Sequence, residues 1–537
     1  MIQTLTITVK PEEEKNEKLI NTLLFRELNK FQKNWTKDDV AFVFEKKSID
    51  ARRGTVKLHL KYKAYIGEKP EASQSAVPEW KKADGNKTVI IVGGGPAGLF
   101  AALKLLEKGI KPVIIERGQE TQQRRKDIAL ISTQNLVNEN SNYCFGEGGA
   151  GTFSDGKLYT RSNKRGDISK ILKILVNFGA DSKILTDAHP HIGTDKLPKV
   201  INNIRTKIIE LGGEFHFHTK CTDFILDNQN GKKIITGIKA EDTQTSEQLT
   251  FNADSVLLAT GHSAPDIYHL VGKTAPSALE AKTFAAGVRV EHPRTYIDAL
   301  QFHGNTQNMP AAEYRVTTQV EERGVYSFCM CPGGFVVPSS SGPDEIVVNG
   351  MSAAARNSKW SNAAIVVEIR PEDIPAEYQK EAEKLGCPAL SGLLFRTAME
   401  KSAKENGKGQ AAPAQKMVDF INNKTSEQLP VTSYTPGIVS SNLNTWLPEH
   451  ICRRLKQGFI NIDKNMKGFI NDNALMIAIE TRTSTPVRIA RDKETFECIG
   501  IKKLYPAGEG SGYSGGIVSS AMDGENSAQA IIHNLGR

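Results

Sequence analysis

The stretch of sequence that decides the fold runs from Val89 to Gly98 and reads VIIVGGGPAG. Its four leading apolar residues predict a strand that is buried on both faces. Gly93, Gly95 and Gly98 then supply the spacing G-x-G-x-x-G where a helix extending to about Lys108 begins. This order of strand, glycine-rich turn and helix predicts a Rossmann-like unit that binds a dinucleotide.

Each glycine of the motif has its own physical task. Gly93 makes the tight turn, Gly95 lets the backbone approach a pyrophosphate, and Gly98 lets the helix pack on the strand. The N-terminus of the helix then offers free N–H groups and a partial positive charge to the phosphates. Glu116 follows the next apolar strand, residues 113–115, and is placed to accept hydrogen bonds from ribose hydroxyls.

The rest of the chain predicts further units around this motif. Residues 1–85 indicate a small N-terminal α/β domain of ferredoxin-like type that ends in a polar linker. We expect an FAD/NAD(P)-binding Rossmann-like domain over residues 86–269, completed by residues 491–537. Residues 270–490 are then an inserted, mixed α/β substrate or cap domain, in which residues 404–415 form a polar break. The predicted fold class is α/β, or α+β overall.

Length, charge and cysteine content narrow the class of protein. The chain has 537 residues, 39% of them hydrophobic and 24% charged, which is an ordinary globular composition. Seven cysteines, an odd number, do not make a disulfide framework and indicate reduced thiols in a cytoplasmic protein. Neither a signal peptide nor an uninterrupted apolar span is evident, so we expect a soluble protein without membrane contact. The net charge of +8 fits a solvated surface, since no nucleic-acid motif accompanies it.

The glycine motif alone does not distinguish NAD from FAD, and two later segments favour FAD. Residues 255–261 form an apolar strand that ends in Ala-Thr-Gly, where the chain turns close beneath a bound dinucleotide. Residues 504–517 read LYPAGEGSGYSGGI and precede a helix of small residues from Val518 to Ile532. Together with the first motif, these segments resemble flavoproteins of the glutathione-reductase type, in which one FAD extends through the whole fold.

This resemblance implies roles for the C-terminal segment. Gly508 and Glu509 would approach the ribityl chain and the pyrophosphate, and the amides of residues 515–517 would face the pyrimidine end of the flavin. A helix N-terminus at that point favours negative charge on a reduced flavin. No second G-x-G-x-x-G follows a strand, so a dedicated NAD(P)H domain is not evident. NAD(P)H remains open as a transient electron donor.

Further segments of distinctive composition are FGEGGAGTFSDGKL at 145–158, FCMCPGG at 328–334, NGMS at 349–352, ETRTSTPVR at 480–488 and SIDARR at 48–53. With them the chain is similar to the uncharacterised FAD-dependent dehydrogenases, sometimes described as NAD/FAD-utilising, from about residue 45 to the C-terminus. Two departures are Ser514, where Ala is expected, and Thr485, where Ser is expected. The family name records a cofactor and no substrate.

The glycine-rich loop at 145–157 supplies many backbone N–H groups from residues that can adopt positive φ, and such a loop can wrap the phosphates or ring edge of a flavin. Arg124 or Arg125 could add a charged contact to the pyrophosphate. Together with the resemblance, these arguments give the expected FAD-binding set: Gly93, Gly95, Pro96, Ala97, Gly98, Glu116, Arg117, Arg124, Gly149, Ala150, Thr152, Cys221, Thr260, Gly261, Gly508, Glu509, Gly515, Gly516 and Ile517.

The fold itself requires no catalytic side chain, because a flavin carries its own hydride and electron chemistry. Cys329 and Cys331 form C-x-C and would point to one face of a strand, which suits either a redox pair or two buried thiols. No partner ligands accompany them, so no metal is expected. His262 and His191 could each act as an acid or base, or only form structural hydrogen bonds.

Arg482 and Arg488 flank a Thr/Ser/Pro turn just before the C-terminal segment. Two functions suit them equally: bidentate binding of an anionic substrate, or ion pairing with carboxylates. We expect the inserted region, residues 270–490, to cover the flavin ring and to build the substrate cavity.

These patterns predict an FAD-dependent oxidoreductase that acts on an unidentified small molecule, an anion if the two arginines bind it. One alternative is a flavin-dependent RNA-modifying enzyme, suggested by the mild basicity and the extra N-terminal domain. The other is a non-catalytic flavin-binding sensor or scaffold whose N-terminal domain recruits a partner. Nucleic acid is the less favoured partner, and the oligomeric state is left open.

Overall fold

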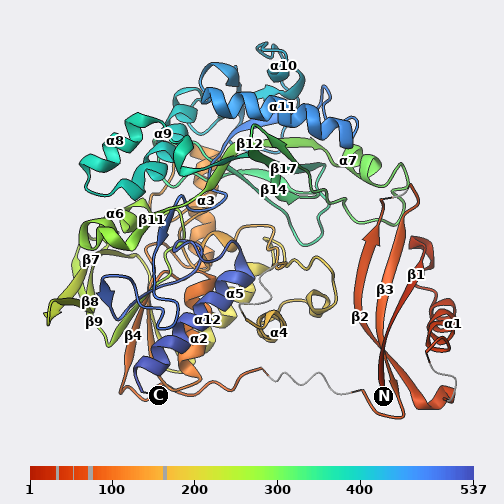
Figure 1. The fold of residues 1–537 in the computed structure, drawn as a ribbon, viewed down its shortest axis with the longest axis horizontal. Helices are drawn as coiled ribbons and strands as arrows, with labels where there is room; N and C mark the ends of the chain where they lie inside the picture. Colours follow the sequence, from red (N-terminus) through yellow and green to blue (C-terminus); the bar gives the residue numbers. More distant parts are fainter. Residues whose placement is uncertain (32–34, 53, 71–76, 161–165, 537) are drawn as a thin grey trace.

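The computed structural model describes residues 1–31, 35–52, 54–70, 77–160 and 166–536. Figure 1 shows a small N-terminal unit standing beside a larger body that holds the rest of the chain. In that view both termini lie along the lower edge, and the long strands β12, β14 and β17 lie above the helices α2 and α12.

The N-terminal unit is a three-stranded antiparallel sheet covered by one helix. Leu5, Ile7 and Val9 alternate along the first strand and share a buried core with Leu24 and Leu28 of the helix. The unit has one helix and one strand fewer than the full ferredoxin-like order β-α-β-β-α-β. Its elements are β1 (Ile2–Val9), α1 (Glu17–Leu28), β2 (Val40–Asp50) and β3 (Lys57–Ile66), in the sheet order β1-β3-β2.

The glycine motif follows the middle strand of a five-stranded parallel sheet. In spatial order the strands are β23 (Leu504–Pro506), β10 (Ser255–Leu258), β4 (Thr88–Val92), β5 (Lys111–Ile115) and β6 (Glu214–His216). Val89 and Ile91 of β4 pack into the core on one face, and Ile90 and Val92 pack into the core on the other. All four side chains are at most 4% exposed, so the prediction of a strand buried on both faces is confirmed.

Helices cover one face of this sheet, and a second sheet covers the other. The helical face carries α2 (Pro96–Leu106), α4 (Ile168–Asn177), α5 (Leu197–Glu210) and α12 (Ile517–Asn534). Helix α3 (Thr121–Gln134) contributes no residue to this core and contacts Thr435 through Ser132. The opposite face carries β7 (Thr219–Gln229), β8 (Lys232–Asp242), β9 (Gln248–Asn252), β22 (Ile501–Lys502) and helix α6 (Pro265–Thr274). Helices α2 and α12 approach so closely that a Cβ at Gly524 would come 2.0 Å from the carbonyl oxygen of Ala97.

The C-terminal segment joins the sheet that the first part of the chain begins. Strand β23 pairs with β10 in the parallel sheet, and β22, just before it, pairs with β8 in the second sheet. The mixed α/β fold with a Rossmann-like unit is therefore as expected, whereas the residue limits of the domains stay a prediction.

A seven-stranded sheet forms the upper layer in Figure 1 and encloses the largest apolar core. Residues 404–415 are not a simple break, because α9 extends to Glu405 and a strand begins at Ala412. Ala412 and Ala414 are both fully buried there. The strands, in spatial order, are β13 (Thr317–Val320), β14 (Arg323–Cys331), β17 (Trp360–Ile369), β12 (Phe284–Pro293), β20 (Leu475–Glu480), β18 (Ala412–Lys416) and β19 (Ile438–Ser440).

The remaining elements flank this sheet. Helices are α7 (Arg294–Gln301), α8 (Ala376–Lys384), α9 (Ser391–Glu405), α10 (Met417–Ile421) and α11 (Glu449–Asn465). Two short ribbons pair β11 (Leu279–Ala281) with β21 (Val487–Ile489) and β15 (Phe335–Pro338) with β16 (Val348–Met351). Within the described ranges, no helix combines the length and the apolar character that crossing a membrane requires.

Candidate functional site

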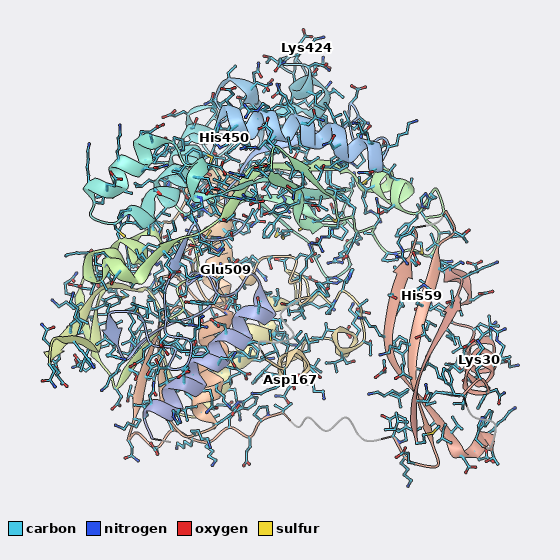
Figure 2. All side chains as sticks on the ribbon, in the orientation of Figure 1. Lys30, His59, Asp167, Lys424, His450 and Glu509 are labelled. Atoms are coloured by element: carbon cyan, nitrogen blue, oxygen red, sulfur yellow. The ribbon has the colours of Figure 1, made fainter. Side chains whose placement is uncertain are left out.

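A cavity of about 360 Å³ opens at the carboxyl ends of β4, β5 and β10 and reaches the ends of β14 and β16 in the upper layer. The strand order changes direction here, because the chain goes from β4 to β5 and β6 on one side and to β10 and β23 on the other. Open α/β sheets bind ligands at such a switch point. Figure 2 shows Glu509, one of the lining residues, in the interior of the molecule between the upper sheet and helices α2 and α12.

Most of the residues that the sequence singled out meet at this cavity. Of the expected FAD-binding and substrate residues, four do not line it: Gly98, Arg124, Thr152 and Arg488. The role of Gly98 toward a ligand stays a prediction. Those that do line it are Gly93, Gly95, Pro96, Ala97, Glu116, Arg117, Gly149, Ala150, Cys221, Thr260, Gly261, His262, Arg482, Gly508, Glu509, Gly515, Gly516 and Ile517.

The three motif glycines meet different surroundings. A Cβ at Gly93 would lie 2.4 Å from the carbonyl oxygen of Ala259, and one at Gly98 would lie 2.1 Å from that of Gly93. Both positions therefore depend on close backbone packing within the protein. A Cβ at Gly95 would meet only the Cα of Gly149, 3.8 Å away, and would otherwise project into the cavity. Gly95 thus keeps clear a space that belongs to a ligand and not to the fold.

Two helices begin at the cavity wall. Gly95 is the N-cap of α2 and Gly516 is the N-cap of α12, and both residues line the cavity. A Cβ at Gly515 or Gly516 would meet no protein atom within 4 Å. The two N-termini therefore present free N–H groups and partial positive charge to open space, as an anionic diphosphate and an electron-rich ring require.

Glu116 connects three glycine-containing segments around the cavity. Its Oε2 accepts a hydrogen bond from Gly94 N (2.9 Å), and its Oε1 accepts from Gly118 N and Gly146 N (both 3.0 Å). A carboxylate has about four acceptor sites, so at least one remains for a ribose hydroxyl. The sequence indicated a contact with the ligand, and the structure adds that this side chain holds the turn and the loop together.

Arg124 faces away from the cavity, which corrects the expected contact with a pyrophosphate. The side chain is fully buried and donates to the carbonyl oxygens of Asn142 (2.8 Å), Tyr143 (3.0 Å) and Glu147 (2.8 Å). Burial lowers the pKa of Arg124 to about 10, against the opposing charge of Glu116. Arg124 therefore anchors the glycine-rich loop from behind.

Two further candidates, Thr152 in the glycine-rich loop and Arg125 on helix α3, also lie outside the cavity. Thr152 is fully buried and donates from Oγ1 to the carbonyl oxygen of Glu147 (2.8 Å). Arg125, the alternative to Arg124, is exposed on α3. Neither side chain reaches the cavity.

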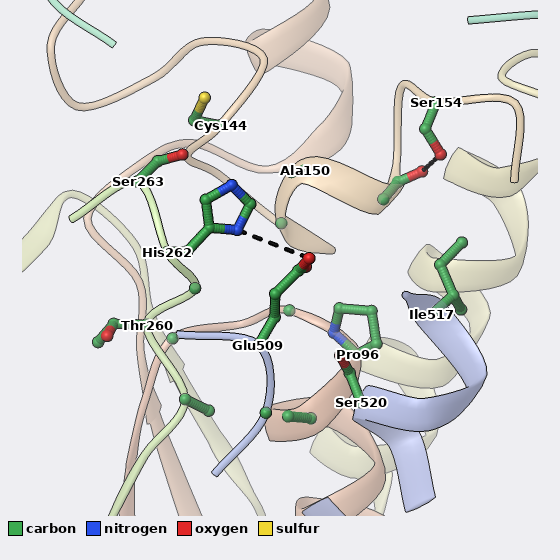
Figure 3. A pocket seen from close by; sticks show the side chains of 18 of the residues that line it. Pro96, Cys144, Ala150, Ser154, Thr260, His262, Ser263, Glu509, Ile517 and Ser520 are labelled. Atoms are coloured by element: carbon green, nitrogen blue, oxygen red, sulfur yellow. Dashed lines mark hydrogen bonds and ion pairs between the residues drawn. The ribbon is translucent and has the colours of Figure 1, made fainter. Parts of the chain in front are cut away.

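His262 and Glu509 are neighbours in the cavity lining. Figure 3 shows the histidine ring pointing toward that carboxylate, with Pro96 and Ile517 on the side of helices α2 and α12. Nδ1 is 3.7 Å from Glu509 Oε1, and Nε2 is 3.1 Å from the carbonyl oxygen of Arg482. Because a carbonyl only accepts hydrogen bonds, Nε2 carries the proton in the neutral ring and Nδ1 is the free base.

Arg482 lines the cavity but its guanidinium is committed to carboxylates. Nη2 is 2.5 Å from Glu345 and 2.9 Å from Glu400, and Nε donates to the same Glu400 (3.1 Å). Although burial favours the neutral carboxyl, Arg482 and Arg396 hold the pKa of Glu400 at about 2. The ion-pair interpretation therefore describes Arg482.

Arg488 lies outside the cavity, so the two arginines do not form an anion clamp. Its side chain is 42% exposed, pairs with Glu280 (3.5 Å) and lies over the ring of Tyr513. The expectation of an anionic substrate thus loses the two residues on which it rested. Arg117, another lining cation, is paired with Asp266 (2.7 Å) and stacks on the ring of Phe145.

Sequence reasoning missed how the C-terminal segment is held. Arg491 pairs with Asp523 of α12 (2.6 Å), and its guanidinium lies 3.9 Å from the ring centre of Tyr513. Asp523 also accepts from Gly508 N (2.7 Å). This cluster fixes the backbone at Gly508 beside the cavity. An Arg and an Asp 32 positions apart gave no local signal.

Lys157 and Cys329 also line the cavity, although the sequence did not predict that they would lie there. Lys157 follows the glycine-rich loop, whose backbone alone was considered. Its Nζ donates to the carbonyl oxygen of Met330, and it forms no ion pair within the described ranges. His191 is elsewhere: its Nε2 lies 3.2 Å from the carbonyl oxygen of Ala354, and burial lowers its pKa.

No three side chains of metal-binding type come together in the part of the chain that the structure describes. The residues present fit a dinucleotide, on three observations: the space that Gly95 keeps clear, the two helix N-termini, and the spare acceptor site of Glu116. FAD satisfies this donor set, because its diphosphate takes the N–H groups and its ribose takes the carboxylate.

Family models match three parts of the chain. Residues 86–134 match an FAD binding domain, residues 283–483 match a domain described as FAD-dependent protein, C-terminal domain-like, and residues 1–65 match a domain of unknown function (DUF8436). The match over residues 283–483 covers most of the seven-stranded sheet, and that over residues 86–134 covers the glycine motif and Glu116.

The similar solved structures are distant in sequence and in TM-score. The glycerol-3-phosphate dehydrogenase from Bacillus halodurans, complexed with FAD, is 11% identical, with 85% of this chain and 66% of that chain covered and a TM-score of 0.36. CtdE in complex with FAD is 11% identical, with 84% and 85% covered and a TM-score of 0.32. THI4 from Thermovibrio ammonificans is 21% identical, with 35% and 62% covered and a TM-score of 0.25.

A much nearer relative is an uncharacterized protein from Clostridium beijerinckii. It is 37% identical over 546 aligned positions, which cover 96% of this chain and 98% of the relative. The finer assignment to the glutathione-reductase type stays a prediction. On this identity and on its two FAD-related domains, the chain belongs to a family of FAD-dependent proteins that includes the Clostridium beijerinckii protein.

Proposed function

We propose that the protein is an FAD-dependent oxidoreductase that transfers hydride or electrons between bound FAD and a small molecule. The observation that carries the proposal is the cavity itself. It lies at the switch point of the parallel sheet, and two helix N-termini open into it. A Cβ at Gly515 or Gly516 would meet no protein atom within 4 Å, and one at Gly95 would meet only the Cα of Gly149 at 3.8 Å.

The cavity walls suggest which residues would hold each part of FAD. The turn from Gly95 to Ala97 would bind the pyrophosphate, and Glu116 would bind the adenosine ribose. Gly508 would adjoin the ribityl chain, and residues 515–517 would adjoin the pyrimidine end of the ring. FAD bound there supplies the hydride and electron chemistry, and the protein orients it.

His262 is the side chain that we propose for proton transfer. Its Nε2 is held by the carbonyl oxygen of Arg482, so Nδ1 is the position that can take up or release a proton. Glu509 Oε1 lies 3.7 Å from Nδ1, so a carboxylate faces the nitrogen that would exchange the proton. A small-molecule substrate would enter from the upper layer, where Lys157 and Cys329 line the cavity.

The first test is whether the purified full-length protein carries a flavin. Absorbance in the flavin bands, and FAD released on denaturation at about one per chain, would support the proposal. Gly95→Val should lose the flavin, whereas the matched control Gly342→Val should keep it. Gly342 is a matched control because it has no protein atom within 4 Å of its Cβ direction, so a side chain fits there as at Gly95, but it lies outside the cavity lining. A colourless protein that does not take up added FAD would overturn the proposal.

The second test concerns turnover. Rapid mixing with NADH or NADPH, followed by oxygen or an artificial acceptor, measures reduction and reoxidation of the flavin. Turnover with either nucleotide would support a transient NAD(P)H donor and would count against a purely sensory role. RNA binding measured at low and high salt tests the alternative of an RNA-modifying enzyme. Binding that weakens steeply with salt would support this alternative, because phosphate contacts depend on salt, and no binding at low salt would exclude it.

A further inference from the structure

Cys329 differs from the other cysteines of the chain. All seven lie in the part that the structure describes, and six of them are buried, whereas Cys329 is partly exposed. It lines the proposed flavin cavity from strand β14 of the upper layer, 176 positions after Phe153 of the glycine-rich loop. Cys144 and Cys221 also line the cavity but are at most 9% exposed.

A β-bulge places Cys329 there. Phe328 pairs with Ala364 and Cys331 pairs with Asn362, so β14 uses one residue more than β17 between the two pairs. The backbone at Cys329 has φ of 42°, in the left-handed region that residues other than glycine rarely adopt. Such strained residues concentrate at functional sites, and here the strain turns Cys329 toward the cavity.

The bulge also brings the two thiols together. In a regular strand, alternate Cα atoms are about 6.6–6.8 Å apart, which is the upper limit for a disulfide. The left-handed residue at Cys329 and the register shift between Phe328 and Cys331 interrupt this regular geometry. The Cys331 thiol is within hydrogen-bond reach of both the Cys329 thiol and the Cys329 carbonyl oxygen (3.4 Å).

Two cations face the pair. Lys157 Nζ is bound to the carbonyl oxygen of Met330, which lies between the two cysteines. The fully buried Arg289 donates from Nη2 to the Cys329 carbonyl oxygen (2.5 Å) and contacts Cys331 Sγ (3.6 Å). Acidic groups also face them: Asp155 lies near Lys157, and Glu480 pairs with Arg289 (2.9 Å).

These contacts favour a thiolate at Cys329. The hydrogen bond with Cys331, and then the charges of Lys157 and Arg289, hold the pKa of the Cys329 thiol well below its usual range, against burial. The pKa of Cys331 is raised in turn, because its partner takes the negative charge and burial disfavours a second one. One thiolate beside one thiol is the arrangement in which thiol–disulfide exchange begins.

We propose that Cys329 and Cys331 form a redox-active dithiol that exchanges two electrons with the bound flavin. In the oxidative direction the Cys329 thiolate and the Cys331 thiol form one S–S bond and release one proton and two electrons, which oxidised FAD takes up to become its reduced anion. The reverse direction cleaves the S–S bond with reduced FAD as the donor. This inference rests on the proposed function, because FAD is the only oxidant it uses.

The decisive measurement is an anaerobic reductive titration of the oxidised holoenzyme with dithionite. The wild type should take up four electrons per FAD, two for the flavin and two for the disulfide. Cys331→Ser and Cys329→Ser should each take up two. The control Cys452→Ala changes a buried thiol of helix α11 and should still take up four. Uptake of two electrons by the oxidised wild type would overturn the inference and leave the proposed function intact.

A second measurement does not depend on FAD. Trypsin releases residues 324–356 as one peptide that contains Cys329 and Cys331 and no other cysteine. After treatment of the folded protein with diamide, this peptide should weigh two hydrogens less and should resist iodoacetamide. A protein that binds no FAD but forms this disulfide would refute the proposed function and the electron exchange with flavin, and would leave only the dithiol pair standing. A peptide that remains fully alkylated would refute the dithiol pair, whatever the flavin content.

Discussion

The carboxylate of Glu116 accepts a 3.0 Å hydrogen bond from the backbone N–H of Gly146, 30 positions further along the chain. A second bond, from Gly94 N to the same carboxylate, ties in the glycine turn. One side chain thus holds the turn after β4 against the glycine-rich loop, where Gly148 N also donates to the carbonyl oxygen of Gly94 (2.9 Å), and the two segments lie side by side in the cavity wall.

Glu116→Ala should therefore weaken both FAD binding and the fold. Loss of the ribose contact should cost about 1–3 kcal/mol of binding free energy, and unfolding of the FAD-free protein should become easier by a similar amount. Glu116→Gln keeps one acceptor oxygen, so its FAD affinity and its stability should lie between those of the wild type and those of Glu116→Ala. Flavin fluorescence titration and urea unfolding measure the two effects. An unchanged FAD dissociation constant would remove Glu116 from the ribose role.

Gly95→Val and Gly98→Val should fail in different ways. At Gly95 the added side chain enters the cavity, so FAD retention should be lost while the melting temperature of the FAD-free protein stays close to that of the wild type. At Gly98 the Cβ would meet the Gly93 carbonyl oxygen at 2.1 Å, so helix α2 must move and the fold should be destabilised. Calorimetry and flavin content separate the outcomes. Full occupancy in Gly95→Val would refute the placement of the pyrophosphate.

Arg482→Met and Arg488→Met should differ strongly in stability. Arg482 is buried between Glu345 and Glu400, and its loss leaves Glu345 without this partner and the buried Glu400 with Arg396 alone, at a cost of about 3–5 kcal/mol. Arg488 forms an exposed pair with Glu280, and such pairs contribute about 0–1 kcal/mol. Neither change should alter FAD-independent binding of a small anion. An anion that binds the wild type but not Arg488→Met would restore the substrate role.

Protonation of His292 should destabilise the protein in mild acid. His292 is fully buried in the upper layer beside the carbonyl oxygen of Phe469, and burial lowers its pKa to about 4. In the unfolded chain the pKa is about 6.5, so the unfolded state binds the proton first. The stability is fully present above about pH 6.5 and falls by on the order of 3 kcal/mol as the pH drops to about 4.

His292→Asn is the variant that isolates this contribution. Urea unfolding of both proteins from pH 8 to pH 4 should show a shallower loss of stability for the variant, because it lacks the titrating ring. Carboxylates that titrate in the same range affect both proteins alike. Parallel profiles for the two proteins would show that His292 does not contribute.

The sequence alone was enough for the local part of the site. The strand β4, the turn at Gly93–Gly98 and the helix α2 are contiguous, so their apolar run and glycine spacing predict their geometry directly. The C-terminal segment was recognised for the same reason, since residues 504–517 precede the helix they open. The pattern of these short stretches does not depend on what packs against them.

The directions of long side chains were decided by the tertiary structure. Arg124 was expected at the phosphates, but three carbonyl oxygens of residues 142–147 hold it behind the loop. For Arg482 the sequence left two roles open, substrate binding and ion pairing. The fold decides for ion pairing, because it brings Glu345 and Glu400, 137 and 82 positions earlier in the chain, next to the guanidinium. A buried guanidinium goes to whichever acceptors the packing leaves unpaired, and no local pattern encodes that choice.

Cys329 is the clearest case of a residue whose position the sequence does not predict. Its C-x-C motif is visible in the sequence, but the alternation of a regular strand would only place both thiols on one face. The extra residue in β14, the left-handed backbone and the approach of Lys157 from the Rossmann-like unit turn one of the two toward the cavity. Each of these depends on the pairing of β14 with β17 and on contact between two layers. Such contacts join residues more than 30 and more than 170 positions apart, so only the folded chain determines them.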